Sequence, residues 1–353
     1  MSFSDSDKIA AILQKEKLNF ADYLALLSPA AADRLEAMAQ RASELTLKFF
    51  GRTILMYAPL YLNNECVNHC AYCGFSEQIP EKRVHLSIAE VEKEADILFQ
   101  KGFRHILLVS GEQRDKVTIG YLKEVISRLH EKFDSISLEI FPLSEDEYRE
   151  LFEAGADGLT IYQEVYDPDI YKKVHPRGPK SDYQFRLLTP ERAAAAGFYR
   201  INIGALLGLG QWQAEAESLG RHAADLKKKF WRAQIAVSFP RLKTSAAGFQ
   251  PINPVSDRQL TQLICALRIF QPSLGLVLST REGKELRDNL MLLGITQMSA
   301  ESKTSPGGYS NDVPAGEQFA TSDKRSLEEV SAVIAGRGYE PVLKDWDKGY
   351  INE

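Results

Sequence analysis

Short apolar runs alternate with amphipathic stretches along most of this chain. A helical pattern follows nearly every run; in 87–101, for example, apolar residues recur at helical spacing, and Ser87 with Glu90 has the arrangement of a capping box. Eight of the runs are short and β-rich, which predicts buried parallel strands. These strands cover residues 60–62, 105–109, 137–141, 158–162, 200–206, 234–239, 275–279 and 295–298.

Eight strand–helix units predict an α/β protein built as a (β/α)8 barrel of the TIM type. A doubly wound sheet also alternates strands with helices, but it usually has fewer strands, so the number of units favours the barrel. Residues 4–50 have helical periodicity with a break at Ser28 and Pro29, which predicts two helices ahead of the barrel. The predicted domains are an N-terminal helical extension (1–50), the barrel (51–300) and a C-terminal loop, helix and tail that close the barrel (301–353).

The composition is that of an ordinary globular protein. The 353 residues are 44% hydrophobic and 26% charged, and the formal net charge is −5. This balance excludes a disordered chain and a strongly basic nucleic-acid binder, so we expect no nucleic-acid partner. No apolar run is long enough to span a bilayer, and the N-terminus lacks the apolar core of a signal peptide. We therefore expect a cytoplasmic protein without a membrane partner.

Three of the four cysteines lie within eight positions of one another. Cys66, Cys70 and Cys73 belong to the segment YLNNECVNHCAYCGF, in a long predicted loop after the first strand. A disulfide framework would spread its cysteines along a small secreted chain, whereas thiolates this close together favour an iron–sulfur cluster or zinc. In a barrel this loop would lie on the C-terminal face, where active sites are found.

Two kinds of metal site fit these three cysteines. A [4Fe-4S] cluster held by three thiolates keeps one iron open to bind a further molecule, which is an arrangement for chemistry. A zinc site would instead add His69 as a fourth ligand and would suit a non-catalytic scaffold barrel. Structural zinc sites usually pair two groups of ligands from separate places, and no second group follows, so the cluster is favoured. Cys265 lies in the helical pattern LTQLICALRIF and is predicted to be core.

The Cys-x3-Cys-x2-Cys spacing resembles that of the radical S-adenosylmethionine (SAM) superfamily. Further segments resemble the aromatic amino acid lyases of that superfamily over nearly the whole chain: YQEVYDPDIYKKVHPRGPKSDYQF, LSTREGKELRDNLMLLGITQMSAESKTSPGGYS and the terminal KDWD. The resemblance implies a radical SAM barrel with a [4Fe-4S] cluster and with SAM bound at its open iron. Electron transfer from the reduced cluster would then cleave SAM to a 5′-deoxyadenosyl radical.

The same resemblance assigns SAM contacts at the ends of several strands. In the family, an aromatic residue beside the third cysteine lies next to the adenine, and a Gly-Gly-Glu-like turn holds the SAM amino group. A Glu and an Arg contact SAM, including its carboxylate, and a glycine-containing strand end passes the adenosine. The matching positions here are Tyr72, Ser110, Gly111, Glu112, Glu164, Arg186 and Gly204. Ser110 departs from the family pattern, and a surface ion pair is the alternative interpretation of Arg186.

Within the lyase group, the sequence is most similar to the tyrosine lyases of bacterial thiamine thiazole biosynthesis. There the radical abstracts hydrogen from the amino group of L-tyrosine, and Cα–Cβ cleavage gives 2-iminoacetate and p-cresol. The implied partners are thiazole synthase, which takes the iminoacetate, and a flavodoxin- or ferredoxin-type reductant. Tryptophan lyase and the tyrosine lyase of hydrogenase maturation are alternatives. The latter has a second cysteine motif, and Cys265 is the one cysteine after Cys73.

An amino acid substrate needs a cation to bind its carboxylate. Arg281 ends the seventh predicted strand in the segment LSTRE, so the barrel places it on the catalytic face, where its guanidinium can bind a carboxylate through two hydrogen bonds. A cation is unfavourable at a helix N-terminus, which strengthens the prediction of a ligand-binding role. The hydroxyls of Ser279, Ser299 and Ser302 could add hydrogen bonds. Candidates for the phenol end are Tyr162, Gln163 and His175.

Overall fold

The computed structural model describes residues 5–243, 248–310 and 315–344. Strands β1 to β8 pair in parallel with their sequence neighbours, and β1 pairs with both β2 and β8, which closes the sheet into a barrel. The predicted (β/α)8 fold is therefore confirmed. The strands are β1 (Thr53–Asn63), β2 (His105–Ser110), β3 (Ser135–Glu139), β4 (Gly158–Glu164), β5 (Arg200–Ala205), β6 (Gln234–Ser238), β7 (Gly275–Leu278) and β8 (Gln297–Ser299).

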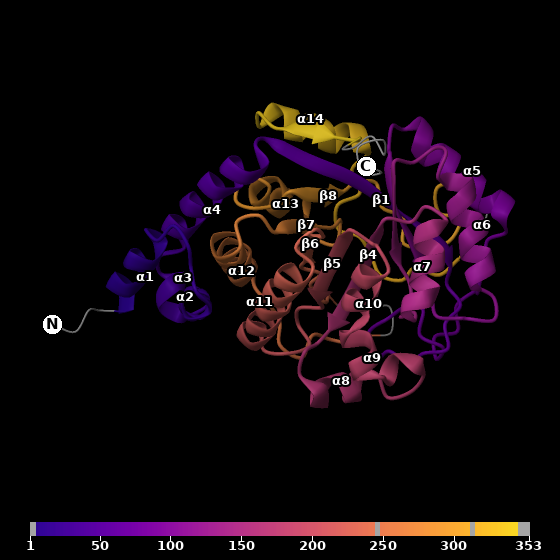
Figure 1. Cartoon of the computed structure of the whole chain (residues 1–353), viewed down its shortest axis with the longest axis horizontal. Helices are drawn as coiled ribbons and strands as arrows, with labels where there is room; N and C mark the ends of the chain where they lie inside the picture. Colours follow the sequence, from indigo (N-terminus) through magenta and orange to yellow (C-terminus); the bar gives the residue numbers. More distant parts are fainter. Residues whose placement is uncertain (1–4, 244–247, 311–314, 345–353) are drawn as a thin grey trace.

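Helices cover the outside of the barrel (Figure 1). The capping box predicted for Ser87 and Glu90 is present at the start of α5. The helices are α5 (Ile88–Gln100), α6 (Ile119–Leu129), α7 (Glu145–Glu153), α8 (Pro168–Val174), η1 (Pro179–Ser181), α9 (Tyr183–Leu187), α10 (Thr189–Ala195), α11 (Trp212–Lys229), α12 (Asp257–Phe270), α13 (Lys284–Leu290) and α14 (Leu327–Gly336).

Strand alternation decides which side chains enter the barrel. In β3, Ile136 and Leu138 are fully buried in the core between sheet and helices, whereas Ser135, Ser137 and Glu139 line the barrel interior. Successive residues of a strand point to opposite faces, so this pattern follows from the period of two. The last inward residue of a strand therefore lies at the C-terminal mouth of the barrel.

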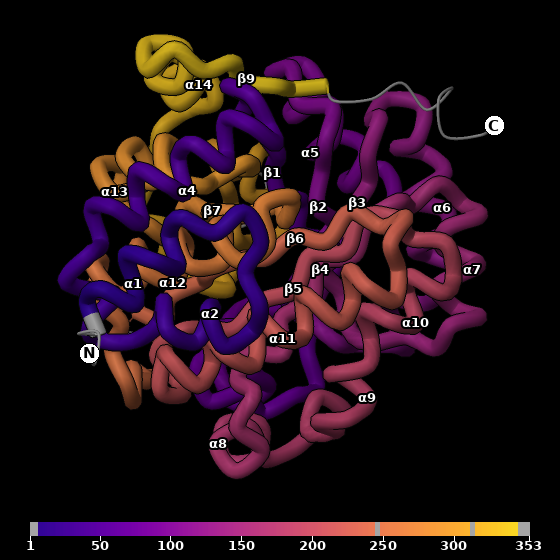
Figure 2. Tube along the Cα trace, turned by 60° about the vertical axis from the view of Figure 1, so that its left-hand side comes forward, coloured from indigo at the N-terminus to yellow at the C-terminus, as the bar shows by residue number. Residues whose placement is uncertain are grey.

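The N-terminal region contains four helices where two were predicted. They are α1 (Asp5–Leu13), α2 (Phe20–Leu26), α3 (Pro29–Ala32) and α4 (Leu35–Phe50). The first predicted helix is divided because Asn19 and Asp22 form a capping box that starts a new helix. Helix α4 lies along α12 (Figures 1 and 2), and Cys265 of α12 is fully buried, as predicted.

The end of the chain returns to the barrel. After α14, the short strand β9 (Glu340–Val342) pairs in parallel with residues 53–55 of β1. Strand β9 has only three residues, which is too short a run to give a strand pattern in the sequence. Pro341 has no backbone NH to donate to a neighbouring strand, which is tolerated in a strand at the edge of a sheet. The predicted loop 301–319 contains neither helix nor strand in its described parts. Most of the KDWD segment lies outside the described residues.

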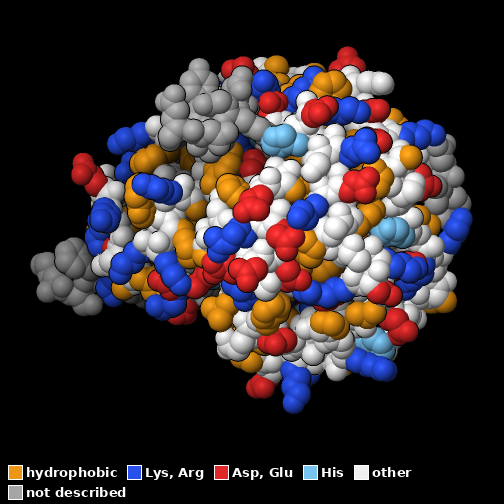
Figure 3. Space-filling view, turned by 45° about the vertical axis from the view of Figure 1, so that its right-hand side comes forward, with side chains coloured by type: hydrophobic (Ala, Val, Ile, Leu, Met, Phe, Trp, Pro, Cys, Tyr) orange, Lys and Arg blue, Asp and Glu red, His pale blue; other side chains and the backbone are white. Residues whose placement is uncertain are grey.

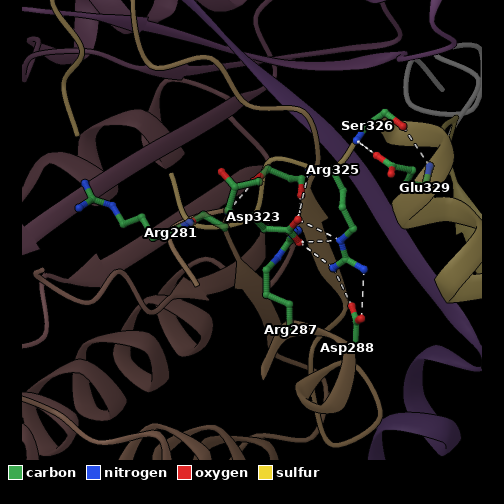
Figure 4. Close-up of polar contacts among 10 residues, drawn as sticks. Arg281, Arg287, Asp288, Asp323, Arg325, Ser326 and Glu329 are labelled. Atoms are coloured by element: carbon green, nitrogen blue, oxygen red, sulfur yellow. Dashed lines mark hydrogen bonds and ion pairs between the residues drawn. The ribbon is translucent and has the colours of Figure 1, made fainter. Parts of the chain in front are cut away.

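A buried ion-pair network fixes the C-terminal segment to the barrel (Figure 4). The fully buried Arg287 pairs with Asp323 and also donates a hydrogen bond to the carbonyl oxygen of Ser299 in β8. Arg325 bridges two carboxylates, at 2.7 Å from Asp323 and 2.8 Å from Asp288. A buried charge that loses its partner is strongly destabilising, so each member of this network depends on the others.

The surface carries no dominant charge of one sign on the face seen in Figure 3, where Lys and Arg side chains are mixed with Asp and Glu. Among the described residues, no helix has the length and apolar character needed to cross a membrane.

We expect Asp323→Asn to lower the free energy of unfolding by about 3–5 kcal/mol, because it leaves Arg287 buried without its counterion. Urea unfolding measures this change. As a control, Lys123→Met removes an exposed ion pair with Glu150 and should cost no more than about 1 kcal/mol. Similar losses in the two variants would contradict the role of the buried network.

The same carboxylate predicts a dependence of stability on pH. Burial alone would raise the pKa of Asp323, but hydrogen bonds from Arg325 and the charge of Arg287 lower it below its usual value. Its contribution to stability is therefore complete at neutral pH and is lost as the pH falls through this lowered pKa. Urea unfolding between pH 7 and pH 3 should show that Asp323→Asn loses less stability on acidification than the wild type.

Candidate active site

Arg83 organises the cysteine loop, which we define as residues 64–87 between β1 and α5. Its guanidinium donates hydrogen bonds of 2.6–3.0 Å to the backbone carbonyls of Asn64, Phe75, Ser76 and Ile79. A long loop without regular structure must satisfy its backbone polar groups by such contacts. One charged side chain therefore joins both ends of the segment that carries the three cysteines.

The three cysteine thiols lie near one another at the barrel mouth. Burial raises the pKa of Cys70 to about 12 and that of Cys73 to about 11, and the charges of the neighbouring cysteines raise both pKa values further. The backbone NH of Phe75 contacts the sulfur of Cys73 at 3.4 Å, and the amide of Asn68 contacts that of Cys66 at 3.5 Å. Such donors stabilise thiolates that bind iron, and binding must displace the thiol protons.

These residues fit an iron–sulfur cluster better than zinc. Both ring nitrogens of His69 have other partners, with Nδ1 at 3.0 Å from Gln78 and Nε2 at 2.9 Å from Glu77. Within the described ranges, no three His, Cys, Asp or Glu side chains are placed to hold a single metal ion. A polynuclear cluster needs more widely spaced thiolates than one ion does. The described residues therefore do not form the predicted alternative zinc site, in which His69 would be the fourth ligand.

The predicted SAM turn, Ser110 to Glu112, adjoins the cysteine loop. Glu112 is buried and accepts a hydrogen bond of 2.7 Å from the Asn68 amide. A Cβ atom on Gly111 would lie 2.2 Å from the carbonyl oxygen of Glu65, so this position requires glycine. The hydroxyl of Ser110 is buried without a hydrogen-bond partner in the described part of the chain. An unpartnered hydroxyl beside a buried carboxylate fits a turn that receives a polar ligand.

Glu164, Arg186 and Lys180 form a buried charged group across the mouth. Lys180 Nζ lies 2.7 Å and Arg186 Nη2 lies 3.5 Å from Glu164 Oε1. Burial alone would raise the pKa of Glu164, but these two cations lower it. Glu164 also has a left-handed φ of 72°, a strain typical of functional sites. The alternative of a surface ion pair for Arg186 is wrong, because Arg186 is only 8% exposed.

His175 orients Tyr72 and does not reach the substrate pocket described below. Its Nε2 lies 2.7 Å from the Tyr72 hydroxyl, and its Nδ1 lies 3.0 Å from the carbonyl oxygen of Tyr171. Burial lowers the pKa of His175 to about 3, so the ring is neutral. Because a carbonyl can only accept, Nδ1 carries the proton and Nε2 accepts from Tyr72. The prediction that His175 contacts the phenol is therefore not supported.

A pocket opens inside the barrel mouth next to this charged group. Ser279, Arg281, Ser299 and Ser302, the four residues predicted to bind substrate, all line it, and so does Tyr162. A larger cavity of about 680 Å³ lies at the opposite end of the barrel, and none of the predicted site residues lines it. Barrel active sites lie at the C-terminal face, so the pocket at the mouth is the candidate site.

Arg281 supplies an unpaired positive charge to this pocket. Its guanidinium carbon lies 3.3 Å from the centroid of the Phe319 ring, and it forms no ion pair within the described residues. Figure 4 shows its side chain extending away from the network of Arg287 and Asp323. The hydroxyl of Ser302 is also buried without a described partner. A guanidinium and a free hydroxyl together can bind a carboxylate.

The two remaining predicted positions are Gln163 and Gly204. Gln163 does not line the pocket: its amide nitrogen lies 3.5 Å from the carbonyl oxygen of Tyr183, so it is not placed to meet a substrate phenol. A Cβ atom on Gly204 would lie 2.6 Å from the Tyr162 ring and 2.9 Å from the Ser238 carbonyl oxygen. The missing side chain of Gly204 therefore makes room for Tyr162, and its contact with adenosine stays a prediction.

Four residues of the site were not predicted from the sequence: Arg83, Asn68, Lys180 and Glu139. Lys180 follows Gly178, whose absent Cβ would lie 2.3 Å from the Asn68 amide oxygen, and this oxygen accepts the backbone NH of Lys180 at 2.8 Å. The glycine in the segment HPRGPK was the available signal of a close approach. Glu139 is a charged residue in an apolar strand, which was the corresponding signal for that position.

Comparison with known proteins agrees with this geometry. Residues 60–221 match the Radical SAM superfamily, and residues 238–340 match the Biotin and Thiamin Synthesis associated domain. The chain is 43% identical to 2-iminoacetate synthase of Salmonella typhimurium over 92% of its own length and 87% of that protein. It is also 43% identical to 2-iminoacetate synthase of Escherichia coli, over 95% and 89%. The chain belongs to the 2-iminoacetate synthase family of radical SAM enzymes.

Solved structures support this membership. HydG, a maturase of the [FeFe]-hydrogenase, superposes with a TM-score of 0.89 at 30% identity, covering 96% of this chain and 76% of HydG. HydG from Carboxydothermus hydrogenoformans gives 0.88 at 35% identity, covering 96% and 80%. As a member of the 2-iminoacetate synthase family, the chain is a radical SAM lyase that uses a [4Fe-4S] cluster and SAM. The cysteine trio and the unpartnered Ser110 hydroxyl fit these groups.

We expect Cys70→Ala to lose the cluster and all SAM cleavage, because two thiolates cannot hold it. Anaerobic reconstitution followed by iron and sulfide analysis should give about four of each per wild-type chain. Cys265→Ala is the matched control, since Cys265 is buried in α12 away from the loop, and it should retain the full iron content. SAM cleavage by Cys70→Ala at the wild-type rate would contradict this assignment.

Arg83→Met should lose most of its cluster even though no ligand is changed. The substitution removes four hydrogen bonds from a charged donor, each worth about 1.5–3 kcal/mol, and frees the loop that carries the cysteines. Iron content after reconstitution measures the effect. Arg128→Met on the exposed face of α6 should leave it unchanged. Wild-type iron content in the Arg83 variant would show that the loop does not depend on this side chain.

Proposed function

We propose that this protein is a tyrosine lyase that converts L-tyrosine to 2-iminoacetate and p-cresol for thiamine thiazole biosynthesis. The observation that carries the proposal is the 43% identity to 2-iminoacetate synthases over 92–95% of the chain. The pocket adds chemical support, because an unpaired guanidinium suits an amino acid carboxylate. Its aromatic walls, which include Tyr57, Tyr61 and Tyr162, suit a phenol ring.

The cluster and SAM, when bound, supply a 5′-deoxyadenosyl radical that abstracts hydrogen from the substrate amino group. Arg281 holds the substrate carboxylate, with Ser302 available as a second donor. Glu112 would accept a hydrogen bond from the SAM amino group, and Arg186 with Lys180 would attract the SAM carboxylate. Together these residues would hold SAM and the substrate in fixed positions, on which hydrogen abstraction depends.

The proposed partners follow from this chemistry. 2-Iminoacetate is an imine that water hydrolyses, so transfer to a thiazole synthase protects it. Each turnover needs an electron at low potential, which a flavodoxin or ferredoxin would supply to the cluster. A cluster of this kind and four free cysteines are suited to the reducing cytoplasm.

An anaerobic assay with SAM, dithionite and either L-tyrosine or L-tryptophan tests the proposal, with products identified by mass spectrometry. We expect p-cresol and 2-iminoacetate, or its hydrolysis product glyoxylate, from tyrosine. A product from tryptophan and none from tyrosine would overturn the tyrosine lyase assignment.

Arg281→Ala should weaken tyrosine binding by about 1.5–3 kcal/mol, or one to two orders of magnitude, through the loss of a charge-assisted contact. We expect the variant to keep its cluster and to cleave SAM slowly without forming p-cresol, because SAM is held elsewhere. Arg281→Lys keeps the charge but not the planar fork and should retain part of the affinity. Normal p-cresol yield with unchanged tyrosine affinity in the Ala variant would remove Arg281 from the substrate site.

A further inference from the structure

Glu139 places a carboxylate in the candidate substrate pocket. It is the last residue of β3 and the third inward side chain of that strand, so it lies at the barrel mouth and lines the same pocket as Arg281. Strands β3 and β7 are four positions apart in the eight-stranded barrel, and Arg281 follows β7. Glu139 and Arg281 therefore approach the pocket from opposite sides.

Glu139 lies between the charged residue of the substrate pocket and those of the predicted SAM site. Its charge interacts with Arg281 on one side and with Glu164, Arg186 and Lys180 on the other. No hydrogen bond to its carboxylate is found among the described residues. The titratable and charged groups that face it are Tyr57 and Tyr61 on β1, Tyr162 and Glu164 on β4, Lys180 on η1, Arg186 on α9 and Arg281 after β7.

Glu139 lies where the amino group of a bound amino acid substrate is expected. An amino acid carries its amino nitrogen and its carboxylate on the same carbon, so the amino group lies beside the carboxylate bound by Arg281. The nitrogen must also face the side of the site where SAM binds, because it gives up the hydrogen. Among the parts of the substrate, the amino group therefore lies between the two sets of charges that Glu139 contacts electrostatically.

We propose that Glu139 binds the substrate ammonium group and takes one proton from it before hydrogen abstraction. This inference rests on the proposed function and adds a residue to it. An α-amino group is mostly protonated at neutral pH, and a neutral amine has a weaker N–H bond than an ammonium. In the proposed step an N–H bond breaks, an O–H bond forms on Glu139, and the electron pair stays on nitrogen. No oxidant or reductant is consumed.

The acidity of Glu139 suits this step. Burial raises its pKa to about 7, and the charge of Glu164 adds to the rise, whereas Arg281, Arg186 and Lys180 oppose it. A base with a pKa near the working pH accepts a proton efficiently and releases it again. An ordinary surface carboxylate would be too weak a base for an ammonium group.

Three ligands separate binding of the amino group from binding of the phenol. L-Tyrosine has both groups, 3-(4-hydroxyphenyl)propionate lacks the amino group, and L-phenylalanine lacks the phenol oxygen. Affinities are measured on the reconstituted wild type and on Glu139→Gln, with SAM present. We expect the variant to bind tyrosine and phenylalanine about 10- to 100-fold more weakly, and the propionate as well as or better than wild type.

Two patterns of ligand affinity would overturn the proposal. If Glu139→Gln leaves tyrosine affinity unchanged, or if it weakens tyrosine and the propionate while sparing phenylalanine, Glu139 does not bind the amino group. The second pattern would assign it to the phenol. Iron content and SAM affinity should match wild type; if Glu139→Gln fails to assemble its cluster, Glu139→Asp carries the same comparison. The Asp variant keeps a carboxylate and should still prefer tyrosine to the propionate.

A pH profile tests proton transfer separately from binding. We expect wild-type kcat/KM for p-cresol formation to fall below about pH 7, because the acceptor must be ionised. In Glu139→Gln this limb should disappear, and the residual rate should rise at alkaline pH, where the free amine is more abundant. Glu139→Asp should restore an acid limb. An unchanged profile in Glu139→Gln would overturn the proton-transfer role. A wild type that forms no p-cresol would instead overturn the proposed function itself.

Discussion

The four hydrogen bonds from Arg83 to backbone carbonyls are the contacts on which the rest of the site depends. They turn a segment without helix or strand into a fixed support for the three thiols. The side chain of Asn64 completes the support by bonding the backbone at Lys82 and Val84, at 2.8 and 2.7 Å. With the loop fixed, Asn68 can reach both Glu112 and the backbone of Lys180, so one amide joins the cysteine loop to both parts of the predicted SAM site.

The barrel mouth collects buried charges that need one another or a ligand. Glu164 stabilises the charges of Lys180 and Arg186, which would otherwise be costly to bury. Arg281 has no such partner among the described residues, and Glu139 has only long-range ones. A zwitterionic amino acid has the two charges that these side chains lack. In this view the substrate completes the charge balance of the pocket, which favours an amino acid over a neutral ligand of the same shape.

The sequence was informative where chemistry follows a fixed spacing or period. All eight barrel strands and the cysteine motif could be predicted from such patterns, and the inward direction of Arg281 followed from barrel topology. Arg83, Asn68 and Lys180 could not, because no local pattern records their contacts. Arg83 bonds backbone carbonyls within its own loop, Lys180 bonds the Glu164 carboxylate, and Asn68 bonds Glu112 and the backbone of Lys180. Gln163 does not line the pocket because it follows the inward-facing Tyr162 and side chains alternate along β4. His175 does not line it either, because it contacts the hydroxyl of Tyr72 instead.

The segment after β8 contacts both the cysteine loop and Arg281 of the substrate pocket. The carbonyl oxygen of Gln318 accepts the backbone NH of Gly74, and its side chain accepts the hydroxyl of Tyr61 at 2.7 Å. The next residue, Phe319, stacks under the guanidinium of Arg281. A Cβ atom on Gly74 would lie 2.3 Å from the backbone of this segment, so the contact leaves little freedom to shift. A displacement of the cysteine loop would therefore also displace Arg281, the group proposed to bind the substrate, and this would couple the position of the cluster to that of the substrate.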